Sequence, residues 1–359
     1  MQAYWDEIVS IWPELESYHD QIDVIYAGLN PDNSILNQLD SDITSDILSA
    51  LEADKRIFFY GVEEGFIKPV LYKIQAIVEN IEFQPHSIVF STSAVNGAEI
   101  YQQLLIAEGW KKPMTIVSGH YFERTNFHTS LMNIPEYNVK TKEKLFTCFN
   151  RVPRSHRAKL LAKMFEYKLV DQAYYSFEGS FSSTKLPIWA TEHFILRRYK
   201  NLLPLRLDIN EDTDNPSKFN DQDLQYHLNS YFSLVTETGF YFTSLAQSSI
   251  FISEKTFRPI CYKHPFIIVS RPGTLSALRD AGYKTFSPWI NEEYDNIIND
   301  DDRLLAIVKE VNILAKFTDA DWLVWQEKVK PIVEHNYRVF RDKTDYSITK
   351  DLHYLLNLA

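Results

Sequence analysis

The stretch SIFISEKTFRPICYKHPFIIVS, residues 249–270, holds the pattern that decides the fold. A short apolar run ends at Ser253, a helical pattern follows over 254–263, and a second apolar run covers 264–270. Short apolar runs that alternate with helical patterns are typical of βαβ units, whose strands are parallel. The stretch therefore predicts an α/β fold with a polar turn where a strand meets a helix.

The same alternation continues on both sides of this stretch. Further strands are expected at 22–29, 56–62, 86–93, 113–119, 145–149, 231–238 and 283–286, and helices at 44–54, 68–80, 96–109, 274–282 and 319–340. Residues 208–223 are polar without an apolar period and predict a surface loop. In the helix expected after residue 149, Leu160, Leu161, Met164 and Phe165 share one face.

A chain of 359 residues with 45% hydrophobic content is too long for one ordinary core and suits two domains. We place the boundary near Thr141, where a second series of strands and helices begins. This gives an N-terminal α/β domain over 1–140, a C-terminal α/β domain over 141–340 and a terminal helix over 341–359.

Charge and composition restrict the partners. The net charge of −11 disfavours polyanions such as nucleic acid, although a local basic groove is compatible with it. Cys148 and Cys261, the two cysteines, sit in apolar runs, so a reducing, cytoplasmic compartment is expected. No apolar run reaches the roughly 18 residues that span a bilayer, and the N-terminus has no signal-peptide pattern, so no membrane span is expected.

The turn Ser253-Glu254-Lys255 is the first candidate site. Ser253 is a potential N-cap, and a helix that starts at the carboxyl edge of a parallel sheet offers N–H groups and positive dipole charge to a phosphate. Lys255 adds a full positive charge, and Glu254 suits a ribose or sugar hydroxyl. Taken alone, the tripeptide favours an ordinary capped helix with solvated charges, because Ser followed by Glu is a common helix start.

The second candidate is the basic segment FNRVPRSHR, residues 149–157. It combines Asn150 with Arg151, Arg154 and Arg157 where a strand turns into a helix. Arginines are bidentate donors for phosphate, and positive charge near a helix N-terminus is unfavourable unless an anion offsets it. We therefore favour a diphosphate site over a solvated basic helix start.

FNRVPRSHR, VTETGF and SSIFISEKTFRPICYKHPFIIV, in this order, resemble the donor domain of the α-1,3-fucosyltransferase family and of related transferases of phages and large DNA viruses. The resemblance covers about residues 144–285. In that family a strand ends in an Asn, and an Arg shortly after it binds the donor diphosphate. Asn150 and Arg157 stand at the corresponding positions of this sequence. Glu237 corresponds to the Glu of a Phe-Glu-Asn element, and Glu254 with Lys255 to a Glu-Lys pair that holds the ribose and phosphate.

The resemblance implies a GT-B-type fold, in which two Rossmann-like domains face a cleft. It also implies a nucleotide-sugar donor and transfer to an acceptor hydroxyl with inversion. Two departures leave the sugar open: Thr238 stands where the family has Asn, and Phe251-Ile252-Ser253 replaces Tyr-Val-Thr. The acceptor is equally open between a glycan, a lipid-linked sugar, a small molecule and a hydroxymethylated base in DNA.

Inverting transfer needs a general base for the acceptor hydroxyl and charge stabilisation for the departing diphosphate. Arg157 and Lys255 suit the second task. For the base, we rank Glu123 and His120, which follow the strand expected at 113–119, ahead of three other acids of the N-terminal domain. These are Glu63, Glu64 and Glu99.

Metal-dependent transferases hold a divalent ion with an Asp-x-Asp pair. Such pairs occur at 40–42, 212–214, 300–302 and 319–321, all in polar stretches or at expected helix starts. We interpret them as loop and capping acids and expect neither a metal nor another cofactor. Dinucleotide and P-loop phosphate patterns are missing from the sequence, which disfavours an epimerase, a dehydrogenase or an NTPase. A non-catalytic nucleotide-sugar-binding module stays as the alternative to an enzyme.

Overall fold

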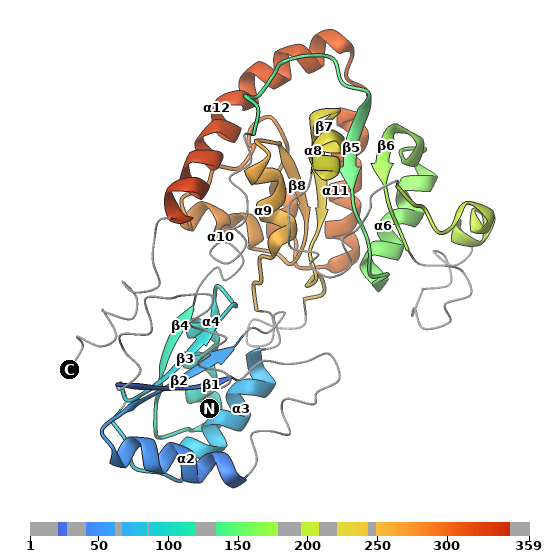
Figure 1. Cartoon of the computed structure of the whole chain (residues 1–359). Coiled ribbons are helices and arrows are strands. Elements are labelled where there is room, and N and C mark those ends of the chain that lie inside the picture. The colour runs from blue at the N-terminus through green and yellow to red at the C-terminus, as the bar shows by residue number, and fades with distance from the viewer. Residues whose placement is uncertain are drawn as a thin grey trace. The chain divides into compact units, whose positions relative to one another are not determined.

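The computed structural model describes residues 21–26, 41–61, 67–84, 86–118, 134–178, 195–207, 221–242 and 249–344. The chain divides into two compact units, shown in Figure 1. The first comprises Met1–Thr125, Thr243–Ile252 and Asp342–Ala359, and the second comprises Asn126–Phe242 and Ser253–Arg341. Within the described ranges, each unit contains a parallel four-stranded sheet. The predicted α/β class with parallel sheets is therefore confirmed.

The sheet of the first unit follows the chain in the order β1-β2-β3-β4, with every neighbouring pair parallel. Its elements are β1 (Ile22–Tyr26), α2 (Ser41–Glu52), β2 (Arg56–Gly61), α3 (Ile67–Val78), β3 (Ile88–Thr92), α4 (Gly97–Glu108) and β4 (Thr115–Ser118). All seven lie where strands and helices are expected from the apolar pattern. Gly109 ends α4 in a left-handed conformation, φ 67°, which favours glycine at a helix C-terminus.

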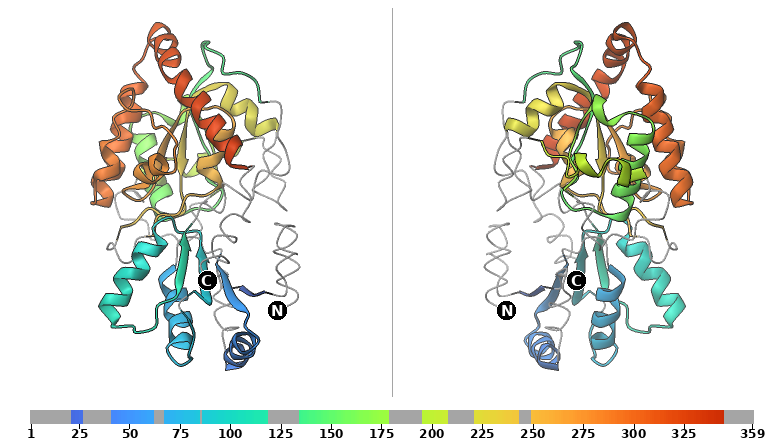
Figure 2. Two further views of the ribbon diagram at one scale, coloured as in Figure 1. Left: turned by 90° about the vertical axis from the view of Figure 1, so that its left-hand side faces the viewer. Right: turned by 90° about the vertical axis from the view of Figure 1, so that its right-hand side faces the viewer.

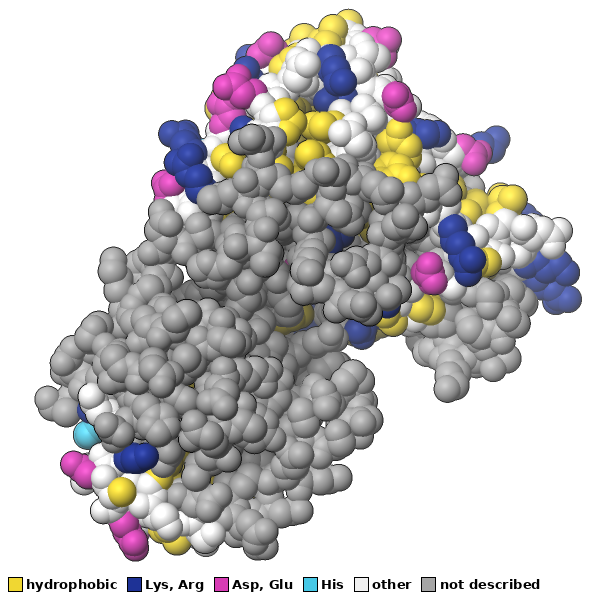
Figure 3. Space-filling model, viewed as in Figure 1, with side chains coloured by type: hydrophobic (Ala, Val, Ile, Leu, Met, Phe, Trp, Pro, Cys, Tyr) yellow, Lys and Arg dark blue, Asp and Glu magenta, His cyan; other side chains and the backbone are white. Residues whose placement is uncertain are grey.

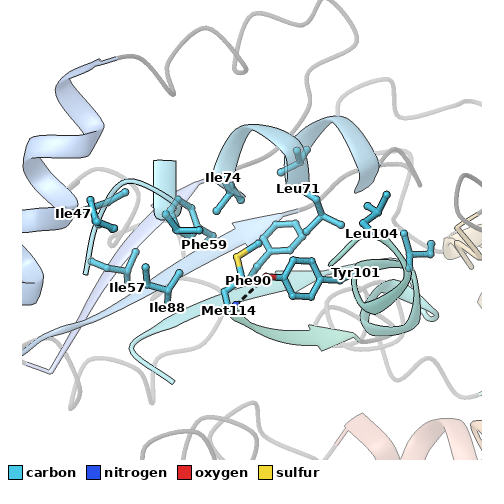
Figure 4. Close-up of a cluster of buried hydrophobic side chains, with 14 of the residues drawn as sticks. Ile47, Ile57, Phe59, Leu71, Ile74, Ile88, Phe90, Tyr101, Leu104 and Met114 are labelled. Carbon is cyan, nitrogen blue, oxygen red and sulfur yellow. Dashed lines mark hydrogen bonds between the residues drawn. The ribbon is translucent and has the colours of Figure 1, made fainter. Parts of the chain in front are cut away.

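The core of the first unit lies between this sheet and its helices. Figure 4 shows Phe59 and Phe90 of the strands packed against Leu71 and Ile74 of α3. Tyr101 of α4 is buried among them, and its hydroxyl accepts a hydrogen bond from the N–H of Met114, 2.9 Å. Buried polar groups are stable when paired in this way.

The second unit contains a sheet of four strands and helices on both of its faces. Its elements are β5 (Lys144–Cys148), α6 (Ser155–Glu166), η3 (Val170–Gln172), β6 (Ala173–Tyr175), η4 (Lys200–Leu202), α8 (Asp221–Leu228), β7 (Ser230–Thr236), α9 (Glu254–Cys261), β8 (Phe266–Val269), α10 (Thr274–Asp280), η6 (Glu293–Asn296), α11 (Asp300–Leu314) and α12 (Asp319–Thr344). Figure 2 shows α8, in yellow, and α11, in orange, on opposite faces of the sheet. The four apolar residues expected on one face of α6 are all buried.

The strand order in the second unit is β6-β5-β7-β8, and all three pairs are parallel. From β5 the chain moves to one side to form β6, and it later returns to form β7 on the other side. The order therefore reverses between β5 and β7. In open parallel sheets, ligands bind outside the carboxyl ends of the strands at such a reversal.

Two predicted strands are wrong. Residues 249–253 form no strand of the second sheet, because Phe251 makes only an isolated antiparallel bridge with Ala94 of the first unit. Residues 283–286 also form no strand. Phe251, Ile252, Tyr283 and Phe286 are buried by packing without strand pairing, and an apolar pattern alone does not distinguish the two.

The division of the chain differs from the predicted ranges at two places. Residues 134–140, expected at the end of the first domain, belong to the second unit, where Gln326 of α12 bonds both backbone groups of Lys140. Residues 249–252, expected in the second domain, belong to the first unit. Of the loop expected at 208–223, residues 221–223 instead begin α8, and residues 208–220 lie outside the described residues. Of the terminal helix expected at 341–359, residues 341–344 are the end of α12, and the rest lies outside the described residues.

In the described part of the chain, no helix is long and apolar enough to cross a membrane.

Candidate functional site

The carboxyl ends of β5 and β7 bring polar side chains together at the reversal of strand order. Asn150, two residues beyond β5, is fully buried, and its Oδ1 accepts a hydrogen bond from Oγ1 of Thr236, the last residue of β7, at 2.6 Å. The Asn150 amide donates to Sγ of Cys148 at 3.2 Å. Asn150 thus joins the ends of the two strands that flank the reversal.

Arg157, in the first turn of α6, is a buried cation at this point. It is 2% exposed, and its terminal nitrogens donate to the carbonyl oxygens of Val152, 2.8 Å, and Thr236, 3.0 Å. Its Nε atom donates to no acceptor among the described residues, and none of their ion pairs involves it. Burial, and then the charge of Arg154, lowers the pKa of the guanidinium. The charges of Glu237 and Glu254 act in the opposite direction, but the described atoms that Arg157 bonds are neutral carbonyl oxygens.

The N-terminus of α6 adds to this positive potential. Arg154 is its N-cap residue and makes no side-chain capping bond, and the first turn contains no acidic residue. Arg151 is exposed just before it. A helix N-terminus carries about half a unit of positive charge. Together with Arg157, it forms a place where an anion lowers the electrostatic energy.

The turn Ser253-Glu254-Lys255 starts α9 beside the end of β7. Ser253 is the N-cap, and its Oγ accepts bonds from the backbone N–H of Lys255, 3.3 Å, and from the Lys255 ammonium, 3.1 Å. The ammonium also bonds Oε1 of Glu254 at 2.8 Å. The expectation that this helix start offers its N–H groups to a phosphate needs correction, because Ser253 already occupies that of Lys255. The ammonium, on a side chain 32% exposed, is the stronger candidate.

Glu254 stays ionised beside Lys255. Burial raises the pKa of its carboxyl, but the charge and hydrogen bond of Lys255, and the charge of Arg258, outweigh burial and lower it overall. A carboxylate on a side chain 18% exposed remains able to accept hydroxyl hydrogen bonds from a ligand.

Glu237, the first residue after β7, is fully buried and binds α9 rather than facing outward. Its Oε1 accepts from the N–H of Ser253, 3.1 Å, and from Oγ1 of Thr256, 2.6 Å. Its Oε2 accepts from Oγ of Ser253 at 2.6 Å. Both carboxylate oxygens are therefore engaged within the protein.

The backbone beyond Glu237 is held by side chains of α6, α11 and the end of β8. His156 bonds the carbonyl of Glu237 at 3.0 Å and stacks on Phe240, with ring centroids 5.2 Å apart. Ser270 donates to the carbonyl of Gly239, and Arg303 to that of Phe240. Burial, together with the charge of Arg157, lowers the pKa of His156 to about 3, so the ring is neutral at pH 7.

The predicted donor residues therefore gather at one edge of one sheet. They are Asn150, Arg151, Arg154, Arg157, Glu237, Ser253, Glu254 and Lys255. The sequence interpretation missed Thr236, which bonds both Asn150 and Arg157, and Thr256, which bonds Glu237. A hydroxyl residue that ends a buried strand was the available signal for Thr236.

Of the candidates for the catalytic base, the structure describes Glu99 alone. Glu123, His120, Glu63 and Glu64 all lie outside the described residues. Glu99 lies in the first turn of α4 in the first unit, where it accepts a bond from Gln103 at 3.3 Å.

Acidic side chains of the segments 300–302 and 319–321 bind protein groups, whereas the pair at 212–214 and Asp40 lie outside the described residues. Asp300 accepts from the N–H of Phe242 and from Arg303, and Asp301 pairs with Lys159 at 2.6 Å. Asp321 accepts the N–H of Thr318 ahead of α12. In the ranges that the structure describes, no three His, Cys, Asp or Glu side chains form a potential metal site. On the face in Figure 3, the coloured Lys and Arg side chains alternate with Asp and Glu.

Comparison with protein-family models, with curated proteins and with solved structures finds no match for this chain.

Proposed function

We propose that the chain is a glycosyltransferase that binds the diphosphate of a nucleotide-sugar donor between Arg157 and Lys255. The observation that carries the proposal is the buried Arg157 at the reversal of strand order, with an Nε atom that bonds no described acceptor. Burial makes the charge of Arg157 costly, the charges of Glu237 and Glu254 offset part of that cost, and a bound anion offsets more. The proposal extends to a GT-B-type architecture, to which the two parallel sheets add support.

The charges of the cluster fit a diphosphate. Arg154, Arg157 and Lys255 are positive, whereas Glu254 offsets part of this charge and Glu237 is engaged by α9. Departure of a nucleoside diphosphate places negative charge on its oxygens in the transition state. Preorganised cations that stabilise such charge contribute a large share of catalysis in transferases of this kind.

Each residue has a separate task in this mechanism. Arg157 and the start of α6 bind one phosphate, and the Lys255 ammonium binds the other as the sugar departs. Glu254 accepts a hydrogen bond from the donor ribose. The side-chain cations supply the charge that a divalent metal supplies in other transferases, so we propose transfer without a metal. Glu123 and His120 remain our candidates for the general base.

A thermal-shift panel of GDP-, UDP-, dTDP- and CMP-linked compounds tests the binding step, because a ligand that binds only the folded state raises the melting temperature. One nucleoside diphosphate is expected to raise it for the wild type. Arg157→Ala and Lys255→Ala are each expected to lose about 1.5 to 3 kcal/mol of calorimetric binding free energy. Arg279→Ala, which removes a half-exposed arginine of α10, is the control and should bind normally.

Slow hydrolysis of the preferred donor distinguishes an enzyme from a binding module. An enzyme releases free nucleoside diphosphate, and both alanine variants lose this release. Binding without release favours the non-catalytic alternative. No response to any compound of the panel would contradict the proposal.

A further inference from the structure

We infer that Glu237 is the positioning residue for Lys255, acting through the hydroxyl of Ser253 without touching the ligand. This inference rests on the proposed function of the same site. Three observations carry it: the complete burial of the carboxylate, its three hydrogen-bond donors, and the position of Ser253 between Glu237 and Lys255.

The direction of the hydrogen bonds makes Ser253 a relay. A serine hydroxyl has one proton to donate and two lone pairs that accept. That proton goes to Oε2 of Glu237, to which the Ser253 hydroxyl donates at 2.6 Å. Both lone pairs are then free for the backbone N–H and the ammonium of Lys255. The carboxylate thereby determines which way Ser253 faces.

The ammonium of Lys255 has three protons, and two of them are directed by these contacts. One bonds Ser253 at 3.1 Å and one bonds Glu254 at 2.8 Å. Two fixed bonds restrict the rotation of the ammonium and aim the third proton. A lysine held in this way loses less side-chain entropy when it binds a phosphate.

The backbone of Glu237 ties this relay to the rest of the site. Its N–H donates to the carbonyl of Val269 in β8 at 3.1 Å, and its carbonyl accepts from His156 in α6. One buried residue therefore connects the helix that carries Arg157 to the helix that carries Lys255. Its side chain, however, acts only on α9.

Ser253 and Thr256 provide a matched pair of variants. Both hydroxyls donate to Glu237 at 2.6 Å, but only that of Ser253 also bonds Lys255. We expect Ser253→Ala and Glu237→Gln each to weaken calorimetric binding of inorganic pyrophosphate by roughly tenfold, within the range of couplings in one hydrogen-bond network. Thr256→Val should reduce stability but change pyrophosphate affinity less than about twofold, since such a hydroxyl affects mainly the fold.

A double-mutant cycle separates positioning from general damage. In a Lys255→Ala background, Glu237→Gln should have no further effect on pyrophosphate affinity, whereas in an Arg157→Ala background its full effect should persist. Equal losses in both backgrounds, or equal losses from Ser253→Ala and Thr256→Val, would overturn the inference and leave the proposed function standing. A wild type that binds neither pyrophosphate nor any nucleoside diphosphate would overturn both.

Discussion

Single residues at the end of β7 combine structural and chemical tasks. Thr236 bonds Asn150 through its side chain and Arg157 through its backbone carbonyl. Glu237 likewise bonds α9 through its side chain and His156 through its backbone carbonyl. Two adjacent residues thus organise both cationic positions of the site. Buried polar networks of this kind are stable only when every member is paired, so single substitutions in them have large effects.

His156 gives a prediction about pH. Its pKa is about 3 in the folded protein and near 6.5 when unfolded, so below pH 6.5 the unfolded chain binds more protons. The contribution of neutral His156 to the free energy of unfolding is therefore complete above pH 6.5 and is lost as the pH falls below that value. At pH 5 the loss is about 2 kcal/mol from this residue.

Urea unfolding at pH 7.5 and pH 5.0 measures this effect. His156→Gln keeps an N–H donor for the carbonyl of Glu237 but does not titrate. Between pH 7.5 and pH 5.0 its free energy of unfolding should therefore fall by about 2 kcal/mol less than that of the wild type. An identical pH dependence of wild type and variant would contradict the prediction, because it would show that the pKa of His156 is the same in the folded and the unfolded protein.

Among the elements, the start of α11 fixes the segment that follows β7. Arg303 is 1% exposed and donates to the carbonyls of Phe240, Ser270, Ile297 and Ile298 and to Asp300. Its guanidinium also lies 4.4 Å from the ring centroid of Phe240. One arginine therefore joins α11 to the segments that leave β7 and β8.

Arg303→Met tests this junction. The substitution keeps the apolar stem but leaves four carbonyl oxygens and a carboxylate without their donor, so we expect a loss of about 3 to 5 kcal/mol in the free energy of unfolding. Denaturant unfolding followed by circular dichroism measures it. Lys309→Met, an exposed change on the same helix, is the control and should cost less than about 0.5 kcal/mol. A similar small loss for Arg303→Met would show that the junction adds little stability.

Elements with a clear period were predictable from the sequence, and those without one were not. The strands of the first unit, β5, β7 and β8 all follow apolar runs. The three residues of β6 are too few to show a period, and α11 opens with Asp300, Asp301 and Asp302, which resemble a loop. The apolar run before Ser253 resembles a strand, yet residues 249–252 belong to the first unit, and only tertiary structure decides with which unit such a run packs.

At the scale of the whole molecule, the sequence does not predict the order of the strands in the second sheet, which determines where the candidate site lies. Chain order alone does not show that β7 lies beside β5, with β6 on the far side. The cationic residues were predictable from the sequence for two reasons. Several arginines at a helix start are unusual, and the segment resembles a known family. The engagement of Glu237 by α9 was not predictable, since it depends on the approach of α9 to β7.

We propose that the donor diphosphate binds where the strand order reverses, between β5 and β7. A crystal structure of the protein with the nucleoside diphosphate selected by the thermal-shift panel measures that location directly. We expect one phosphate at the N-terminus of α6 within hydrogen-bond distance of Arg157, and the other on the ammonium of Lys255. A diphosphate bound away from the carboxyl ends of β5 and β7 would contradict the proposed site.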